Sequence, residues 1–206
     1  MKIAIVGTAT SEKEAPYNDP SWQIWSLGAT QKRTPRYDRW FELHTQQRLV
    51  KDKVLVSTDL KECKEKLYLI EPWPQFPDAS LYPKQEIIAK YGTYFTSSIA
   101  WMLIMAIHEG ATEIGFWGVH MGGENEYQFQ RPCCEFWIGR ALEKGIKVKI
   151  HPDSSLLKGE MYCDGLYWDV CVMEKEAKEK AELARDENSY RVGYYDALRK
   201  IKRTFG

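Results

Sequence analysis

The chain has 206 residues, of which 44% are hydrophobic and 28% are charged, so it is long enough for one sizeable core and too short for two. Its 29 basic and 29 acidic residues cancel, and overall charge therefore favours neither a nucleic acid nor a membrane surface as partner. The sequence lacks a run of about eighteen apolar residues, which argues against a membrane-spanning helix. The first residues run into Gly7 without a signal-peptide cleavage pattern, and we therefore expect a cytoplasmic protein.

The first predicted element is a strand at 2–6, a nearly all-apolar run that is typical of a strand covered on both faces. Similar short apolar runs predict further strands at 22–27, 40–43, 54–57, 67–70, 114–117 and 146–150. A helix is predicted at Thr96–Glu109, which is apolar on most faces. Another is predicted at Gln130–Lys144, which is amphipathic and is followed by Gly145, a residue suited to a helix C-cap.

Alternation of strands and helices in the later part of the chain predicts parallel pairing through right-handed crossovers. The expected fold class is α/β, a Rossmann-like parallel sheet flanked by helices, with a C-terminal helical extension. Ligands of such sheets bind in the loops at the carboxyl ends of the strands. Those loops begin here at Gly7, Gly28, Glu71 and Gly118.

Two segments depart from this pattern. Residues 71–83 hold four prolines, which exclude a helix or a central strand and leave either a long ordered loop or a mobile lid. Further on, Glu, Lys and Ala dominate, so we divide the chain into a Rossmann-like nucleotide-binding domain, 1–170, and a helical extension, 171–206. The last predicted helix docks on the domain or on another subunit of a homo-oligomer through one apolar stripe. The stripe consists of Tyr194, Leu198, Ile201 and Phe205.

The turn after the first strand is a candidate phosphate site. Its small and hydroxyl residues would let backbone amides approach an anion closely. They are Gly7, Thr8, Ala9, Thr10 and Ser11. Because this segment matches neither a Gly-x-Gly-x-x-Gly nor a Walker motif, the alternative is a plain strand-to-helix turn.

Three consecutive hydroxyl residues, Thr96, Ser97 and Ser98, precede the most apolar helix of the chain. One of them is expected to cap the helix, and the others could present hydroxyls and amides to the same anion. The sequence leaves both roles open.

The loop at 117–127 follows a buried strand and collects polar groups beside glycines. Gly118 begins it, His120 is a candidate general base, and Tyr127 is a candidate ligand of a phosphate. An exposed loop histidine without a role is the alternative. Arg131, near the start of the next helix, either clamps a phosphate or is a solvated first-turn residue.

Glu42 and His44 form a second candidate catalytic pair. They lie two residues apart at the end of a predicted strand, so their side chains share one face, and an acid and a base could cooperate there. An edge strand with polar residues turned to water explains the pair equally well. His108, inside the apolar helix, and His151, before Pro152, are interpreted as structural.

No metal site or disulfide framework is expected. The five cysteines are odd in number and form no Cys-x-x-Cys pair, and the four histidines show no His-x-x-x-His spacing. The cysteines are Cys63, Cys133, Cys134, Cys163 and Cys171.

Residues 94–157 resemble the bacterial sialyltransferases that have a single Rossmann-like domain, and related uncharacterised glycosyltransferase-like proteins. Thr96-Ser97-Ser98 resembles the family's Thr-Ser-Gly helix start, and 113–119 its strand and Gly-hydrophobic turn. Residues 145–148 and 152–157 are similar to its last strand and Ser-Leu-Leu ending, and 7–11 to its opening turn. The segments 19–22 and 39–44 are similar to small phage-encoded proteins, which would imply the host cytoplasm.

The chain also departs from that family. Where the family has a histidine base before a helix, this chain has Tyr127-Gln128-Phe129. Gly122 or Gly123 stands where the first of two phosphate-binding tyrosines is expected, and Ser26-Leu27-Gly28 lacks the family's asparagine.

The resemblance implies a metal-independent glycosyltransferase that needs no cofactor beyond its nucleotide-sugar co-substrate. Tyr127 and Arg131 would stabilise the departing phosphate, and His120 or His44 would deprotonate an acceptor hydroxyl. The phage likeness adds a hydroxymethylated DNA base as an acceptor. The alternatives are a non-catalytic protein that binds or sequesters a nucleotide, and a base- or nucleoside-modifying hydrolase that uses His44 and Glu42.

Overall fold

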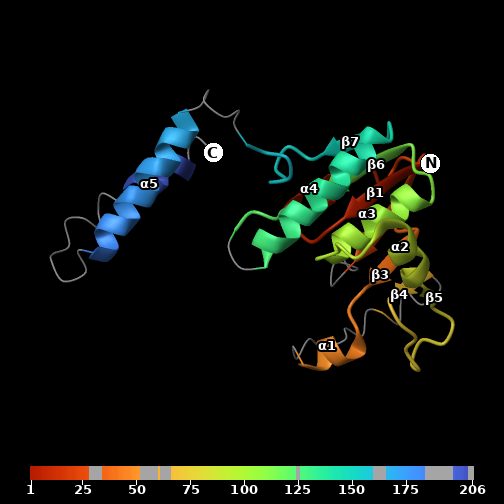
Figure 1. The fold of residues 1–206 in the computed structure, drawn as a ribbon. Coiled ribbons are helices and arrows are strands. Elements are labelled where there is room, and N and C mark those ends of the chain that lie inside the picture. The colour runs from red at the N-terminus through yellow and green to blue at the C-terminus, as the bar shows by residue number, and fades with distance from the viewer. Residues whose placement is uncertain are drawn as a thin grey trace. The chain divides into compact units, whose positions relative to one another are not determined.

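The computed structural model describes residues 1–27, 34–51, 60, 66–123, 126–159, 166–183 and 197–203. The chain forms two compact units, residues 1–157 and residues 158–206, which are considered separately below. Figure 1 shows the first unit as strands and helices and the second as helical.

The described strands of the first unit form one sheet in the order β5-β4-β3-β2-β1-β6-β7. Their bounds are β1 Lys2–Val6, β2 Trp22–Leu27, β3 Arg39–Glu42, β4 Leu67–Leu69, β5 Ser80–Leu81, β6 Glu113–Trp117 and β7 Lys147–Ile150. Every pair of neighbouring strands is parallel, which confirms the α/β, Rossmann-like fold class expected from the sequence. The strand predicted at 54–57 lies outside the described residues.

Helices connect and cover these strands. They are the short 3-10 helix η1 Thr10–Glu14, α1 Gln46–Lys51, α2 Lys84–Tyr91, α3 Ser98–His108 and α4 Tyr127–Glu143. In Figure 1, α3 and α4 lie side by side across the sheet, in contact with β1 and β7 respectively.

The core has one large layer and one smaller layer, on opposite faces of the sheet. Alternate side chains of β1 divide between them: Ile3 and Ile5 pack with α3 and α4, whereas Ala4 and Val6 pack with Trp22 on the other face. All four of these β1 side chains are fully buried, as an all-apolar central strand predicts. Helix α3 is apolar all round because it lies between the sheet and α4.

Two predicted boundaries needed correction. Helix α4 begins at Tyr127 rather than at Gln130, so Pro132 lies inside it. Its start follows Glu126, which makes no side-chain capping bond, and the usual capping signal is therefore missing from the sequence. The proline-rich segment 71–83 ends in the two-residue strand β5, which forms the edge of the sheet, where prolines are tolerated.

The second unit contains α5, Leu166–Leu183, and a further helical segment at 197–203. Lys202 Nζ lies 2.7 Å from Glu174 Oε2, which joins the two helices, and Leu198 is buried between them and their surroundings. Tyr194 and Phe205 of the predicted stripe lie outside the described residues. A domain boundary at 170/171 would fall within α5, so the division at 1–170 and the homo-oligomer stay predictions. None of the described helices is long and apolar enough to cross a membrane.

Candidate functional site

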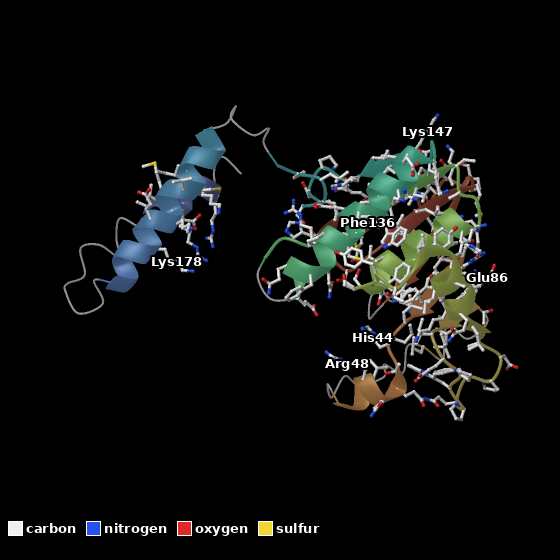
Figure 2. All side chains as sticks on the ribbon, in the orientation of Figure 1. His44, Arg48, Glu86, Phe136, Lys147 and Lys178 are labelled. Atoms are coloured by element: carbon white, nitrogen blue, oxygen red, sulfur yellow. The ribbon has the colours of Figure 1, made fainter. Side chains whose placement is uncertain are left out.

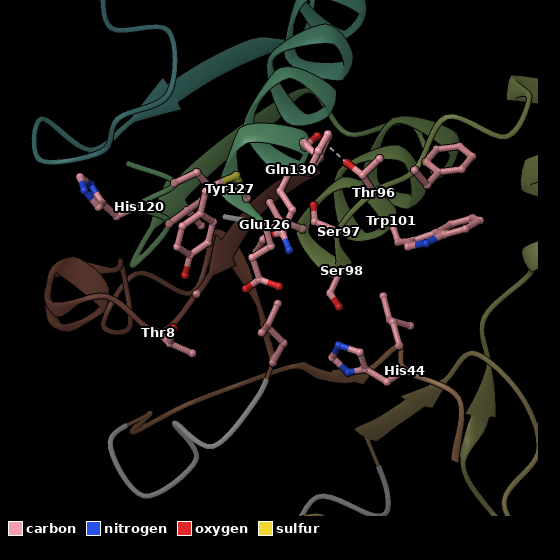
Figure 3. Close-up of a pocket in the computed structure, with 18 of the residues that line it drawn as sticks. Thr8, His44, Thr96, Ser97, Ser98, Trp101, His120, Glu126, Tyr127 and Gln130 are labelled. Carbon is pink, nitrogen blue, oxygen red and sulfur yellow. Dashed lines mark hydrogen bonds between the residues drawn. The ribbon is translucent and has the colours of Figure 1, made fainter. Parts of the chain in front are cut away.

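A crevice of about 610 Å³ opens at the carboxyl ends of β1 and β6 (Figure 3). The strand order turns at β1, because β2 lies on one side of it and β6 on the other. The loops after β1 and β6 therefore leave the sheet next to each other, at the position where open parallel sheets bind their ligands. Gly7 and Thr8 from the first loop and Gly118 to Met121 from the second line the crevice.

The turn after β1 is held by hydrogen bonds within the protein. Its Gly7 and Ala9 amides donate to the carbonyl oxygens of Trp117 and Gly118, both at 2.8 Å. The Ser11 hydroxyl accepts a 3.0 Å bond from the Gly118 amide and is 6% exposed. Of the five residues that the sequence proposed here, Gly7 and Thr8 line the crevice, whereas Ala9, Thr10 and Ser11 do not.

The N-terminus of α3 forms the opposite wall. Ser97 is its N-cap, since its hydroxyl accepts a 3.1 Å bond from the Ala100 amide, and the Thr96 hydroxyl donates to the Phe129 carbonyl at 2.9 Å. Ser98 makes no side-chain hydrogen bond to another described residue, and Figure 3 shows its hydroxyl in the crevice. An 11-residue helix with an exposed hydroxyl in its first turn is a suitable anion site.

Behind the N-cap, the thiol of Cys134 lies 3.4 Å from the Ser97 hydroxyl. Burial raises the pKa of Cys134 to about 12, and the Ser97 hydrogen bond opposes this rise only in part. The thiol is therefore neutral at physiological pH and supports the N-cap without adding a charge beside the crevice.

Glu42 and His44 form a hydrogen-bonded pair at the end of β3. His44 Nδ1 lies 2.6 Å from Glu42 Oε1, which also accepts a 3.1 Å bond from the His44 amide. Because a carboxylate accepts hydrogen bonds only, Nδ1 carries the proton of the neutral ring, and Nε2 is the proton-accepting nitrogen. The His44 side chain is 53% exposed and lines the crevice.

His120 is held differently. Its Nδ1 lies 3.0 Å from the Asp153 carbonyl oxygen, which again assigns the ring proton to Nδ1. Its Nε2 is close to Gly122, where an added Cβ would come within 2.8 Å. In Figure 3 the His120 ring lies at one end of the crevice and turns away from Ser98 and His44.

The start of α4 places Glu126 and Tyr127 in the crevice, and Figure 3 shows both side chains directed toward its centre. Arg131 is not a lining residue: its Nε donates a 2.8 Å bond to Glu135, one turn further along the helix. Glu135 also accepts the Leu157 amide at 2.8 Å, so the arginine belongs to a contact that fastens the end of the first unit.

Sequence reasoning missed a basic residue and most of the apolar wall. Arg48, from α1, is the one Lys or Arg among the described lining residues; Figure 2 labels it and His44 on the segment that follows β3. Its position four residues after His44 was the available signal. The apolar and aromatic lining residues comprise Leu27, Leu43, Phe95, Ile99, Trp101, Val119, Met121 and Phe129.

Within the described residues, no group of three or more His, Cys, Asp or Glu side chains is arranged to hold a metal ion. The expectation that no metal is bound stays a prediction.

The sheet and its crevice define a Rossmann-like α/β protein with an open ligand site. No protein-family model matches the chain, and no curated protein matches it. Solved structures do match, and the following are sialyltransferases, the family that the sequence resembles. They include sialyltransferase CstII from Campylobacter jejuni with the substrate analogue CMP-3FNeuAc, at 16% identity and a TM-score of 0.47, covering 74% of this chain and 81% of that one. An alpha-2,3-sialyltransferase from the same organism matches at 17% identity and a TM-score of 0.45, over 75% and 76%. Sialyltransferase CST-II with a trisaccharide acceptor and CMP matches at 15% and 0.47, over 75% and 83%.

Proposed function

We propose that this protein is a metal-independent glycosyltransferase-like enzyme that binds a nucleotide sugar in the crevice and transfers the sugar to an acceptor hydroxyl. The observation that carries the proposal is the position of the α3 N-terminus. Its Ser98 hydroxyl faces the crevice at the point where the strand order turns. Helix dipole, hydroxyl and switch-point location together favour an anionic ligand such as a nucleotide phosphate.

The nucleotide would lie between the loops after β1 and β6. Gly7, Thr8 and Gly118 would contact it there, while Ser98 and the first amides of α3 would bind its phosphate. Arg48 adds the positive charge that a departing phosphate requires, and the Tyr127 hydroxyl can donate a further hydrogen bond. Arg131 is less suited to this role because it is paired with Glu135.

In the proposed reaction, the acceptor oxygen attacks the anomeric carbon of the sugar. The bond from that carbon to the phosphate oxygen breaks, and its electron pair leaves with the phosphate. The proton of the acceptor hydroxyl passes to a base at the crevice, for which the histidines His44 and His120 are the candidates. The acceptor is a hydroxyl compound, and the hydroxymethylated DNA base that the phage likeness implies is one such compound.

A panel of nucleotide sugars tests the proposal. Incubated with a suitable donor and no acceptor, the enzyme should release free sugar slowly, because an activated donor leaks to water. The rate should be unchanged by a chelator. A protein that binds donor tightly and returns it intact would instead support the non-catalytic, sequestering alternative. Failure to bind any nucleotide or nucleotide sugar would overturn both.

A matched pair of serine variants tests the site. Ser98→Ala removes the hydroxyl in the crevice and should weaken nucleotide binding roughly 3- to 10-fold, the worth of one hydrogen bond to a charged group. Ser80→Ala, on the exposed edge strand β5, should leave binding unchanged. Equal effects of the two substitutions, measured by calorimetry with the nucleoside monophosphate, would place the phosphate elsewhere.

A further inference from the structure

We propose that His44 is the base that takes the proton of the acceptor, that Glu42 positions it, and that the acceptor is an uncharged carbohydrate bound against Trp101. This inference rests on the proposed transferase function and goes beyond it, because it assigns the base and the substrate class. It begins from the 2.6 Å bond between Glu42 Oε1 and His44 Nδ1.

That bond fixes what the histidine can do. Glu42 is 14% exposed at its side chain, so the carboxylate is held at the sheet edge while the more exposed ring reaches into the crevice. Figure 3 shows the His44 ring and the Ser98 hydroxyl directed toward one another. The base therefore faces the site proposed for the donor phosphate, across the space where the anomeric carbon and an attacking hydroxyl would meet.

Two other crevice groups are less suited to the task. His120 is bonded to the Asp153 carbonyl, and its ring is turned toward Gly122, away from Ser98. Glu126 presents a carboxylate, which is a weaker base than a neutral imidazole at neutral pH. A buried carboxylate behind an imidazole, by contrast, stabilises the positive charge that appears on the ring when it accepts a proton.

The acceptor class follows from the wall beside His44. Trp101 lies three residues after Ser98 on α3, so both side chains occupy the same face of the helix. Phe95 stacks on the Trp101 ring at 4.1 Å between centroids, and Tyr82 packs against its edge at 5.3 Å. With Leu43 beside His44, these residues form an apolar, aromatic platform within reach of the base.

Charge separates a carbohydrate from a nucleic acid on this platform. Protein contacts to nucleic acids are made largely to phosphates through Lys and Arg side chains. Arg48 is the one such residue among the described lining residues, Glu126 opposes it, and the chain has no net charge. An aromatic ring flanked by so little positive charge suits the C–H face of an uncharged sugar, with a hydroxyl directed at His44.

The atoms balance in the resulting step. The acceptor O–H gives its proton to His44 Nε2 while its oxygen forms a bond to the anomeric carbon. The bond between that carbon and the donor phosphate oxygen breaks, and the electron pair stays on the phosphate. The imidazolium that forms is paired with the Glu42 carboxylate and later releases its proton to water.

Two substitutions at one position test the base. The amide nitrogen of asparagine in His44→Asn can still donate to Glu42, but nothing replaces Nε2. We expect this variant to lose transfer by roughly 100- to 10,000-fold in kcat, with donor affinity and slow donor hydrolysis within about twofold of the original. Glu42→Gln should lower kcat less and shift the acid side of the pH profile of transfer. Thermal unfolding confirms that each variant is folded.

The acceptor arm uses nitrophenyl glycosides and, for comparison, an oligonucleotide that carries a hydroxymethylated cytosine. Trp101→Leu should raise KM for the glycoside at least about tenfold with a smaller change in kcat. If His44→Asn transfers normally while His120→Asn or Glu126→Gln does not, the assignment of the base is wrong although the transferase proposal stands. A preference for the oligonucleotide would overturn the carbohydrate assignment alone. Absence of donor turnover by the unsubstituted protein would overturn the transferase proposal itself.

Discussion

A Cβ atom on Gly7 would lie 2.4 Å from the carbonyl oxygen of Gly118, and a Cβ atom on Gly118 would lie 2.7 Å from the carbonyl oxygen of Gly7. The two glycines that end β1 and β6 are thus in direct backbone contact. This contact lets the two loops leave the sheet together and forms one side of the crevice. Glycine is required at both positions for steric reasons that are independent of any ligand.

A glycine series should separate this contact from simple backbone strain. Gly118→Ala combines a positive φ of 65° with the clash, and we expect it to lower the free energy of unfolding by at least about 2 kcal/mol. Gly110→Ala has a φ of 76° but meets nothing within 4 Å, so about 1 kcal/mol is expected. Gly139→Ala, in open space inside α4, should stabilise by roughly 0.5–1 kcal/mol. Urea unfolding measures all three, and equal losses at Gly118 and Gly110 would contradict the contact.

Neighbouring hydroxyls of the same turn should have different roles. Ser11→Ala removes the acceptor of the buried Gly118 amide and should cost about 1–3 kcal/mol of stability. Thr8→Ala changes an exposed crevice residue, so stability should move by less than about 0.5 kcal/mol while nucleotide affinity falls. Urea unfolding and calorimetry on both variants provide the comparison. If Thr8→Ala destabilised and Ser11→Ala instead lost affinity, the roles assigned to the two residues would be reversed.

The sheet was predictable from sequence because its strands carry their own signal. Buried on both faces, β1 and β2 appear as short apolar runs between polar turns, and the apolar helix α3 is equally plain. The edge strand β5 was not predicted, because two exposed residues after a proline-rich loop carry no pattern. Such a strand is specified by its neighbour β4 rather than by its own composition.

The crevice was less predictable because its residues are selected by long-range contacts. Ser11 looked like a ligand residue, but its hydroxyl is bound to an amide 107 residues away. Arg131 looked like a first-turn residue; the earlier start of α4 moves it to the second turn, where Glu135 follows at helical spacing. Trp101 sits in a helix that is apolar all round, so periodicity could not indicate which of its faces lines a cavity.

Cys134 should make stability fall at alkaline pH. Its pKa is raised to about 12 in the folded protein by burial, whereas an unfolded cysteine titrates near about 8.5. The unfolded chain therefore loses this proton first, so the group's contribution is complete below about pH 8.5 and is lost as the pH rises toward 12. Between about pH 8 and 10, the original protein should lose roughly 2 kcal/mol more than Cys134→Ala. Parallel losses would show that the thiol does not titrate differently on folding, and Cys171→Ala, in the second unit, serves as the control.

Glu126 places a negative charge in a crevice that we propose binds a phosphate. Its exposed carboxylate repels the ligand across a short, partly solvated gap, where such an interaction is worth about 0.5–1 kcal/mol. Glu126→Gln should therefore tighten binding of a nucleoside monophosphate roughly two- to fivefold in calorimetry at low salt. The gain should shrink as salt screens the charge.

The matched control is Glu143→Gln at the other end of α4, where the side chain is paired with Arg140 at 3.2 Å and does not line the crevice. Its nucleotide affinity should equal that of the original protein at every salt concentration. Weaker binding by Glu126→Gln would mean that the carboxylate accepts hydrogen bonds from a sugar hydroxyl of the ligand. In that case the phosphate lies nearer to Arg48 than to the start of α4, because only there would the carboxylate be far enough away for its contact to outweigh the repulsion.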